Sequence, residues 1–170
     1  MHPIAWERKW SDRRAATHRA GEKKLKIEGS YEIKAARERV WDLLNDVDVL
    51  RDCIPGCESL TPAGPDTFEA ELSVGIGMIR GSYSGRVRIS DRKKPGSYRL
   101  EIEGEGPGGF IKGDATITLQ ATGESVTTVT VDGDGEVGGM LARVGQRLIG
   151  QASKSLMKQF FDCAGKKARG

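Results

Sequence analysis

The stretch GGMLARVGQRLIGQASKSLMKQFFDCAGKKA, residues 138–168, decides the fold, because it is the one segment long enough to cover a whole sheet. Apolar side chains recur in it every three or four residues, which is the spacing of one helix face. The basic side chains lie mostly off that face. We therefore predict one long helix here. Its apolar stripe comprises Leu141, Val144, Leu148, Ala152, Leu156 and Phe160.

The segments before this helix alternate apolar and polar residues with a period of two. In FEAELSVGIGM, residues 68–78, every second side chain is apolar. This pattern is typical of an antiparallel sheet packed on one side only. The predicted order is a strand over 25–34, short helices near 36–45 and 46–53, about six strands and the long helix. The expected fold class is α+β, with a curved antiparallel sheet of about seven strands around the C-terminal helix.

The composition indicates one soluble globular domain. The chain has 170 residues, 30% of them charged, and no apolar run that approaches the length of a membrane span. We expect a single domain over 25–164, a disordered N-terminal extension over 1–24 and a fraying basic tail over 165–170. Three cysteines do not form a disulfide framework, and with no signal peptide in the sequence a reducing, cytoplasmic location is expected.

Positive charge is concentrated at the two ends of the chain. Residues 141–170 carry seven basic side chains and one acidic, whereas residues 25–140 carry thirteen basic and twenty acidic. This is not the distribution of a nucleic-acid-binding groove. It fits either a solvated helix face with a loose tail or a face that contacts a membrane or a protein partner. The candidate contact residues are Arg143, Arg147, Lys154 and Lys158.

Glycines occupy several positions on the inward face of the predicted sheet. A glycine inside a strand loses packing and costs backbone entropy, so a cluster of them needs a reason. The glycines either permit the bulges and coiling of a strongly bent sheet or leave space for a ligand beneath the helix, and both can hold together. They are Gly85, Gly104, Gly106, Gly113, Gly133 and Gly135.

An internal cavity at this place would have almost wholly apolar walls. The only histidines, His2 and His18, lie in the N-terminal extension, so no Ser-His-Asp or Cys-His arrangement is available in the folded part. The sequence therefore predicts a site that binds an uncharged apolar molecule without catalysis, metal or cofactor. Besides Gly104, Gly106, Gly113, Gly133 and Gly135, the predicted lining is Leu72, Val74, Ile76, Met78, Tyr83, Tyr98, Leu100, Ile111, Leu141 and Val144.

The turn CIPGC, residues 53–57, is expected at the mouth of this cavity. Structural zinc sites commonly use C-x2-C or C-x4-C with four ligands, whereas this pair is C-x3-C and has no core histidine to join it. The pair follows a helix, and a helix C-terminus disfavours a thiolate, which argues against a redox pair. The favoured interpretation is a rigid Pro-Gly turn braced by small side chains. The turn residues are Cys53, Ile54, Pro55, Gly56 and Cys57.

A family resemblance is carried by four stretches, CIPGCESL (53–60), VGIGMIRGSYSGRVRISD (74–91), GEGPGGFIKGDATITL (104–119) and VGGMLARVGQRLIGQASKSLMKQFF (137–161). In this order they resemble the carbon monoxide dehydrogenase G-subunit family, which belongs to the START-like (SRPBCC), helix-grip superfamily. The resemblance covers about residues 25–161. It implies an accessory protein that recruits a molybdenum hydroxylase to the cytoplasmic face of the membrane. Molybdopterin, iron–sulfur clusters and flavin would then reside in other subunits.

Three functions follow from these features. The first is a carrier for a hydrophobic molecule, such as a lipid or quinone, that links a molybdenum hydroxylase to the inner face of the cell membrane. The second is a protein–protein adaptor for dehydrogenase assembly that binds no ligand. The third is an enzyme of the same superfold, such as a cyclase or hydratase, and the lack of a core histidine counts against it.

Overall fold

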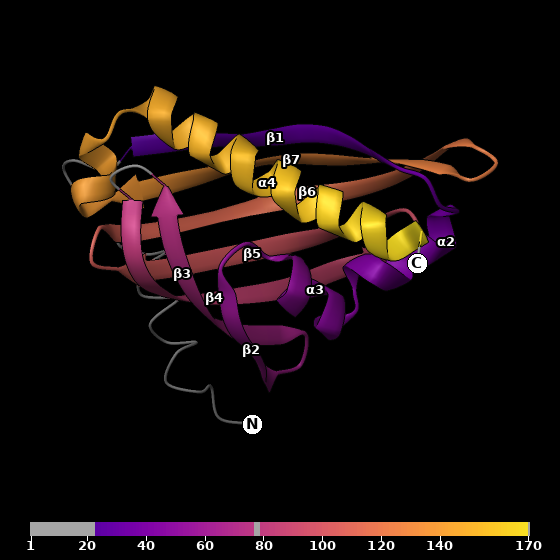
Figure 1. The fold of residues 1–170 in the computed structure, drawn as a ribbon, viewed down its shortest axis with the longest axis horizontal. Coiled ribbons are helices and arrows are strands. Elements are labelled where there is room, and N and C mark those ends of the chain that lie inside the picture. The colour runs from indigo at the N-terminus through magenta and orange to yellow at the C-terminus, as the bar shows by residue number, and fades with distance from the viewer. Residues whose placement is uncertain (1–22, 77–78, 170) are drawn as a thin grey trace.

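The computed structural model describes residues 23–76 and 79–169. Within them, seven antiparallel strands form one sheet in the order β1-β7-β6-β5-β4-β3-β2 (Figure 1). The strands are β1 (Lys23–Ile33), β2 (Cys57–Gly64), β3 (Thr67–Ile76), β4 (Ile79–Lys93), β5 (Ser97–Gly106), β6 (Gly109–Gly123) and β7 (Val126–Gly138). Helices α2 (Arg37–Leu44) and α3 (Val47–Cys53) follow β1, and α4 (Gln146–Arg169) is the C-terminal helix. The predicted α+β architecture is confirmed.

The first strand starts earlier than the sequence pattern indicates. Lys23 and Lys24, placed by prediction in a disordered extension, are the first residues of β1 and pair with Val137 and Glu136 of β7. Residues 1–22, which make up the rest of that predicted extension, lie outside the described residues.

The two small helices begin and end within one residue of their predicted ranges. Asp46 caps α3, because its carboxylate accepts a hydrogen bond from the Asp48 amide at 2.9 Å. Beyond the end of α3, Gly56 has φ 75°, a left-handed conformation that glycine adopts without strain. This turn reverses the chain into β2.

The predicted single helix over 138–168 is wrong at its start. Gly138 belongs to β7, a 3-10 turn η1 (Gly139–Arg143) follows, and α4 begins only at Gln146. Gly139 and Gly145 have φ of 72° and 95°, and a left-handed residue interrupts a right-handed helix. At the other end α4 runs through Arg169, so residues 165–169 of the predicted fraying tail are helical.

The buried face of α4 also differs from the predicted stripe, because the break at Gly145 separates Leu141 and Val144 from the helix. Leu148, predicted to be buried, is 38% exposed. At the other end of the stripe Phe161 is buried, whereas the predicted Phe160 is only half-buried. The buried residues of α4 are Ile149, Ala152, Phe161 and Ala164. The helix lies along β1, where the Phe161 ring stacks on Tyr31 with centroids 4.5 Å apart (Figure 1).

One cross-strand row on the outer face of the sheet alternates in charge over six strands. Arg86 Nε lies 3.8 Å from the Glu69 carboxylate, and Lys112 Nζ lies 3.6 Å from that of Glu136. Opposite charges on directly paired strands stabilise one register over others. We call this row the charge ladder. From β3 to β1 it reads Glu69, Arg86, Glu103, Lys112, Glu136 and Lys24.

The core lies between the inner face of the sheet and helices α2 and α4. Its most completely buried large side chains come from β1, α2, β6 and β7, and all are less than 2% exposed. They include Ile33, Val40, Leu44, Leu119 and Val129. This closed region covers one part of the sheet, and the inner face of β3, β4 and β5 lies beside it.

Candidate functional site

The inner face of β3, β4 and β5 is apolar but incompletely covered. Several of its side chains are only half-buried, although Ala70, Tyr83, Ile89 and Tyr98 on the same face are buried, as are Val131 and Val137 on β7. The difference arises because α4 lies along β1, at the other edge of the sheet (Figure 1). We call the half-buried set, together with Ile111 of β6, the apolar face. It comprises Phe68, Leu72, Val74, Val87, Leu100, Ile102 and Ile111.

The inward glycines differ in how closely other side chains approach them. A Cβ built on Gly113 or Gly135 would lie 3.1 Å from Ile27 Cδ1, so a side chain of β1 already fills that space. The facing pair Gly85 and Gly104 differs. A Cβ on Gly85 would lie 3.1 Å from the Glu103 carbonyl oxygen and near no side chain, and one on Gly104 would lie in ordinary contact with Ile111 Cγ2 at 3.5 Å. No side chain comes as close to this second pair as Ile27 does to Gly113 and Gly135, so the packing of side chains is looser here.

Two other inward glycines make room for neighbouring side chains. A Cβ on Gly133 would lie 2.7 Å from the Cβ of Ala115. A Cβ on Gly106 would lie 2.6 Å from Cδ1 of Tyr83, which is tighter than any ordinary contact. At these positions the absence of a side chain permits dense packing rather than leaving a void.

Tyr83 lies on the inner face of β4, two residues from Gly85, and is 6% exposed. Its Oη is next to the β5–β6 turn, where a Cβ on Gly108 would lie 2.6 Å from Oη and 3.4 Å from Leu141 Cδ2. The Leu141 amide donates a hydrogen bond to the Gly108 carbonyl at 2.8 Å, which joins η1 to this turn. Two predicted lining residues, Tyr83 and Leu141, are thus brought together.

The remaining predicted lining residues lie in different surroundings. Tyr98 belongs to the closed core under α2, where its ring meets Trp41 edge-on at 5.4 Å and burial raises the pKa of its hydroxyl. Val144 is half-buried just after η1. Met78 lies outside the described residues, and Ile76 is described only as a strand position.

The turn after α3 lies against β3. The Ser73 amide donates to the Gly56 carbonyl at 2.8 Å, and Cys57 pairs with Leu72 in the strand register. The turn is therefore beside a half-buried residue of the apolar face. The Cys57 thiol donates to the Ser59 carbonyl at 3.4 Å, and burial raises the pKa of that thiol, which keeps it protonated. Ile54 and Pro55 are half-buried.

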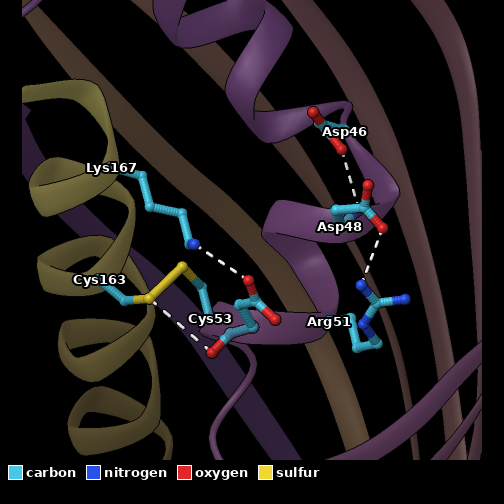
Figure 2. A network of polar contacts seen from close by, with 7 residues as sticks. Asp46, Asp48, Arg51, Cys53, Cys163 and Lys167 are labelled. Carbon is cyan, nitrogen blue, oxygen red and sulfur yellow. Dashed lines mark hydrogen bonds and ion pairs between the residues drawn. A yellow bond between two sulfur atoms is a disulfide. The ribbon is translucent and has the colours of Figure 1, made fainter. Parts of the chain in front are cut away.

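Cys53 has a partner that the sequence analysis missed. It forms a disulfide with Cys163 of α4, so the interpretation of Cys53 as only a small bracing side chain is wrong (Figure 2). Next to it, Lys167 Nζ donates to the Asp52 carboxylate at 3.0 Å and lowers the pKa of that carboxyl. We call these four residues the α3–α4 clasp. No local motif indicates the pairing, because the two cysteines are 110 residues apart.

A surface hollow of about 490 Å³ lies beside the clasp, lined by Gln159, Asp162, Cys163, Lys166 and Lys167. The Cys163 sulfur is held in the disulfide, and the Asp162 carboxylate accepts a hydrogen bond from Lys158 Nζ at 2.8 Å. With its sulfur in the disulfide, the hollow offers no free thiol as a nucleophile.

Apolar and basic side chains are exposed together where η1 leads into α4. Met140 is 62% exposed and Leu148 38%, and both are large apolar side chains. Arg143 and Arg147, also exposed, come from the same two elements. We call these four residues the exposed patch. The sequence pattern indicates the two arginines but not Met140, because Met140 lies in the 3-10 turn η1 and not in the regular helix predicted there.

The other predicted contact residues lie further along α4. Lys154 is exposed, and Lys158 is exposed but pairs with Asp162 at 2.8 Å, which raises the pKa of its amine. Surface pairs of this kind contribute little to stability.

Metal sites and membrane-spanning helices are two features that would narrow the function. Across 23–76 and 79–169, no group of three or more His, Cys, Asp or Glu side chains could hold a metal ion. In the same ranges, no helix has both the length and the apolar character needed to cross a membrane. The apolar face itself is built from aliphatic and aromatic side chains, which bind by excluding water.

Comparison with known proteins finds a matching family and a similar structure. The family model of the carbon monoxide dehydrogenase G subunit (CoxG) matches residues 29–169. A conserved protein from Geobacillus kaustophilus of known crystal structure is 36% identical, has a TM-score of 0.83, and is matched over 85% of this chain and 95% of that chain. Among curated proteins, none matches the chain.

More distant structures share the fold. A START superfamily protein from Mycobacterium smegmatis is 11% identical with a TM-score of 0.67, over 85% of this chain and 97% of that chain. Norcoclaurine synthase from Thalictrum flavum, solved as a point mutant with a transition-state analogue, is 15% identical with a TM-score of 0.61, over 89% of this chain and 100% of that chain. These similarities show a START-like fold and nothing about activity.

Proposed function

The chain belongs to the CoxG family, that of the carbon monoxide dehydrogenase G subunit, and from this premise we propose that it is a non-catalytic accessory protein of a molybdenum hydroxylase. In this proposal it holds an apolar small molecule, a lipid or a quinone, against the apolar face. By carrying that molecule it links the dehydrogenase to the inner face of the cell membrane.

The observation that carries the proposal is the half-buried apolar face, to which the facing glycines Gly85 and Gly104 contribute no side chain. Apolar surface left partly exposed inside a fold is a cost to stability that a bound apolar molecule removes. Because the glycines provide the space, the site accepts a bulky group only as long as these positions have no side chain. The turn at Gly56, held to Ser73, forms one edge of the site.

The exposed patch supports the membrane part of the proposal. Met140 and Leu148 would insert at the level of the lipid headgroups, while Arg143 and Arg147 would face anionic phosphates. Each basic side chain near an anionic surface contributes about 1 kcal/mol. Met140 and Arg143 of the patch belong to η1, which is hydrogen-bonded to the β5–β6 turn. Membrane contact would therefore occur close to Tyr83 and the apolar face.

A ligand experiment tests the carrier function directly. The purified protein is extracted with organic solvent, analysed by native mass spectrometry, and titrated with decyl-benzoquinone while its melting temperature is followed. We expect a co-purifying apolar molecule, or a melting temperature that rises with quinone concentration. If the wild-type protein shows neither a co-purifying apolar molecule nor a rise in melting temperature, the proposal loses its basis.

Two glycine variants make the ligand experiment specific. Gly104→Leu places a bulky side chain on the apolar face, where the nearest atom to a Cβ is Ile111 Cγ2 at 3.5 Å, and should abolish binding. Gly123→Leu adds the same group at the exposed end of β6, with similar room at 3.4 Å, and should bind as the wild type does. Equal loss in both variants would point to a general effect on folding.

The adaptor function is the second candidate, and the exposed basic side chains of α4 favour it. Arg147 and Lys154 present positive charge that a protein partner can recognise. A pull-down with the dehydrogenase subunits tests this contact. If adaptor binding is the whole function, Gly104→Leu should support carbon monoxide oxidation in cells as well as the wild type does.

A further inference from the structure

The Tyr83 hydroxyl is a buried polar group for which the fold provides no hydrogen-bond partner. The residue is 6% exposed, and its Oη has no donor or acceptor within reach in the described part of the chain. Folded proteins almost always pair such groups, because an unpaired buried hydroxyl has lost its bonds to water without replacement. An exception therefore requires an explanation.

Two glycines shape the surroundings of this hydroxyl, at the end of β5 and in the β5–β6 turn. Gly106 makes room for the ring, and Gly108 makes room for Oη, since a Cβ on either would lie 2.6 Å from the tyrosine. The Gly108 carbonyl, which belongs to the same turn, is already used by the Leu141 amide at 2.8 Å. The phenol thus lies at one end of an apolar surface with its polar atom unused.

We propose that Tyr83 is the polar anchor of the site, and that its hydroxyl binds a single neutral oxygen, a carbonyl or a hydroxyl, at the end of an otherwise apolar ligand. This inference rests on the proposed carrier function and adds a ligand class to it. A phenol both donates and accepts, so either kind of oxygen satisfies it. The apolar part of the ligand lies over Gly85 and Gly104, two residues along β4 and β5 from the tyrosine and from Gly106.

A charged head group does not fit this position. None of the side chains that form the apolar face is charged, so a carboxylate or phosphate that lay along this face would be desolvated without a counter-charge from it. A purely hydrocarbon ligand would leave the hydroxyl as unsatisfied as before. The site therefore selects an oxygen-bearing neutral lipid over both alternatives.

The test compares the full-length wild-type protein with Tyr83→Phe, using 1-decanol and the length-matched alkane undecane as probes in calorimetric titrations. We expect Tyr83→Phe to bind decanol about 10-fold more weakly than wild type and to bind undecane equally well. The unliganded variant should melt at the same temperature as wild type or higher, because it loses only an unpaired hydroxyl. Tyr98→Phe, which removes a buried phenol hydroxyl in the closed core under α2, should leave both affinities unchanged.

Every other outcome contradicts either the role of Tyr83 as the anchor or the carrier function. If Tyr83→Phe binds decanol as tightly as wild type does, Tyr83 is not the anchor while the carrier function stands. If unliganded Tyr83→Phe melts at a lower temperature, the hydroxyl has an internal structural role and the anchor is overturned. If the wild-type protein binds neither probe, the carrier function fails and the anchor fails with it.

Discussion

Cys53 and Cys163 are 110 residues apart in the chain, yet a disulfide joins them with their Cα atoms 5.3 Å apart. It fastens the end of α3 to the C-terminal half of α4 (Figure 2). Beside it, Lys167 pairs with Asp52, and the Arg39 guanidinium donates to the Lys167 carbonyl at 3.3 Å. Because α3 leads directly into the turn next to the apolar face, the clasp connects the covering helix to the edge of the proposed site.

Reduction of this disulfide should lower the free energy of unfolding by about 2 to 5 kcal/mol, since it closes a loop of roughly 100 residues in the unfolded chain. The measurement is urea unfolding with and without a dithiol reductant, together with Cys163→Ser. Cys57→Ser serves as the control, because Cys57 is a free thiol. If the reductant leaves the wild-type midpoint unchanged, the two thiols are not bonded in solution.

The glycine next to Tyr83 gives a prediction about packing. Gly106→Ala places a Cβ 2.6 Å from the tyrosine ring and 2.8 Å from the Ser82 carbonyl, and we expect it to destabilise the fold by about 1 to 3 kcal/mol. Gly104→Ala has its nearest neighbour at 3.5 Å and should cost little or stabilise the strand. Thermal unfolding of both variants checks the difference, and equal costs would contradict the packing around Gly106.

These glycines also show how far the sequence could predict the site. The period-two pattern predicts which residues face inward, and it correctly places Gly85, Gly104 and Gly113 on one face. It does not reveal that Ile27, 86 positions before Gly113, fills the space at that glycine. Strand pairing across the sheet decides this, so the sequence alone cannot distinguish glycines packed against a distant side chain from glycines with looser surroundings.

The start of α4 and the disulfide were missed for two further physical reasons. The apolar spacing around Leu141 fits a helix, but the left-handed φ of Gly139 and Gly145 breaks it, and a periodicity argument does not detect backbone handedness. Cys53 and Cys163 meet only because the C-terminal half of α4 packs against α3. Tertiary contacts between distant segments lie beyond any local motif.

The charge ladder predicts an unequal response to the same charge change at two positions of β4. Arg86 is paired with Glu69 on one side and Glu103 on the other, so Arg86→Glu places three acidic side chains in a row. We expect a loss of about 2 kcal/mol in unfolding free energy. Arg88 is exposed and lies between Thr67 and Glu101 in the strand register. Arg88→Glu should therefore lower the unfolding free energy by less than about 1 kcal/mol. Urea unfolding distinguishes them, and equal losses would show that the ladder contributes nothing specific.

The ion pair of the clasp gives a pH dependence whose sign follows from the carboxyl. Lys167 lowers the pKa of Asp52 below its ordinary value of 3.8, so the folded state favours the charged carboxylate. The stabilisation is therefore present above pH 3.8 and is lost as the pH falls through the lower folded-state pKa. Unfolding midpoints of wild type and Asp52→Asn should differ at neutral pH and converge on acidification. Because both partners are exposed, added salt should also shrink the difference.

A double mutant separates this pair from unrelated effects of acid. Because the two side chains interact, the change in unfolding midpoint caused by Asp52→Asn together with Lys167→Met should differ from the sum of the changes caused by the two single substitutions. A constant difference between wild type and Asp52→Asn from neutral to acidic pH would mean that the pair does not form in solution.

The exposed patch predicts separable apolar and electrostatic contributions to membrane binding. Arg143→Gln with Arg147→Gln should weaken binding to vesicles containing phosphatidylserine by about 30-fold, since each arginine contributes about 1 kcal/mol near an anionic surface. Met140→Ser with Leu148→Ser removes the inserting side chains and should weaken binding by about 10-fold, with an unchanged salt dependence. Vesicle co-sedimentation at several salt concentrations measures both effects.

A matched control tests whether the contact is local to the patch. Lys154→Gln removes an exposed positive charge two turns further along α4, and it should change vesicle binding much less than either arginine substitution. If Lys154→Gln has the same effect as Arg147→Gln, binding follows net charge rather than a docking surface. If the wild-type protein stays in the supernatant with anionic vesicles at low salt, the patch does not contact the membrane, and a protein partner becomes the better explanation for its exposed apolar residues.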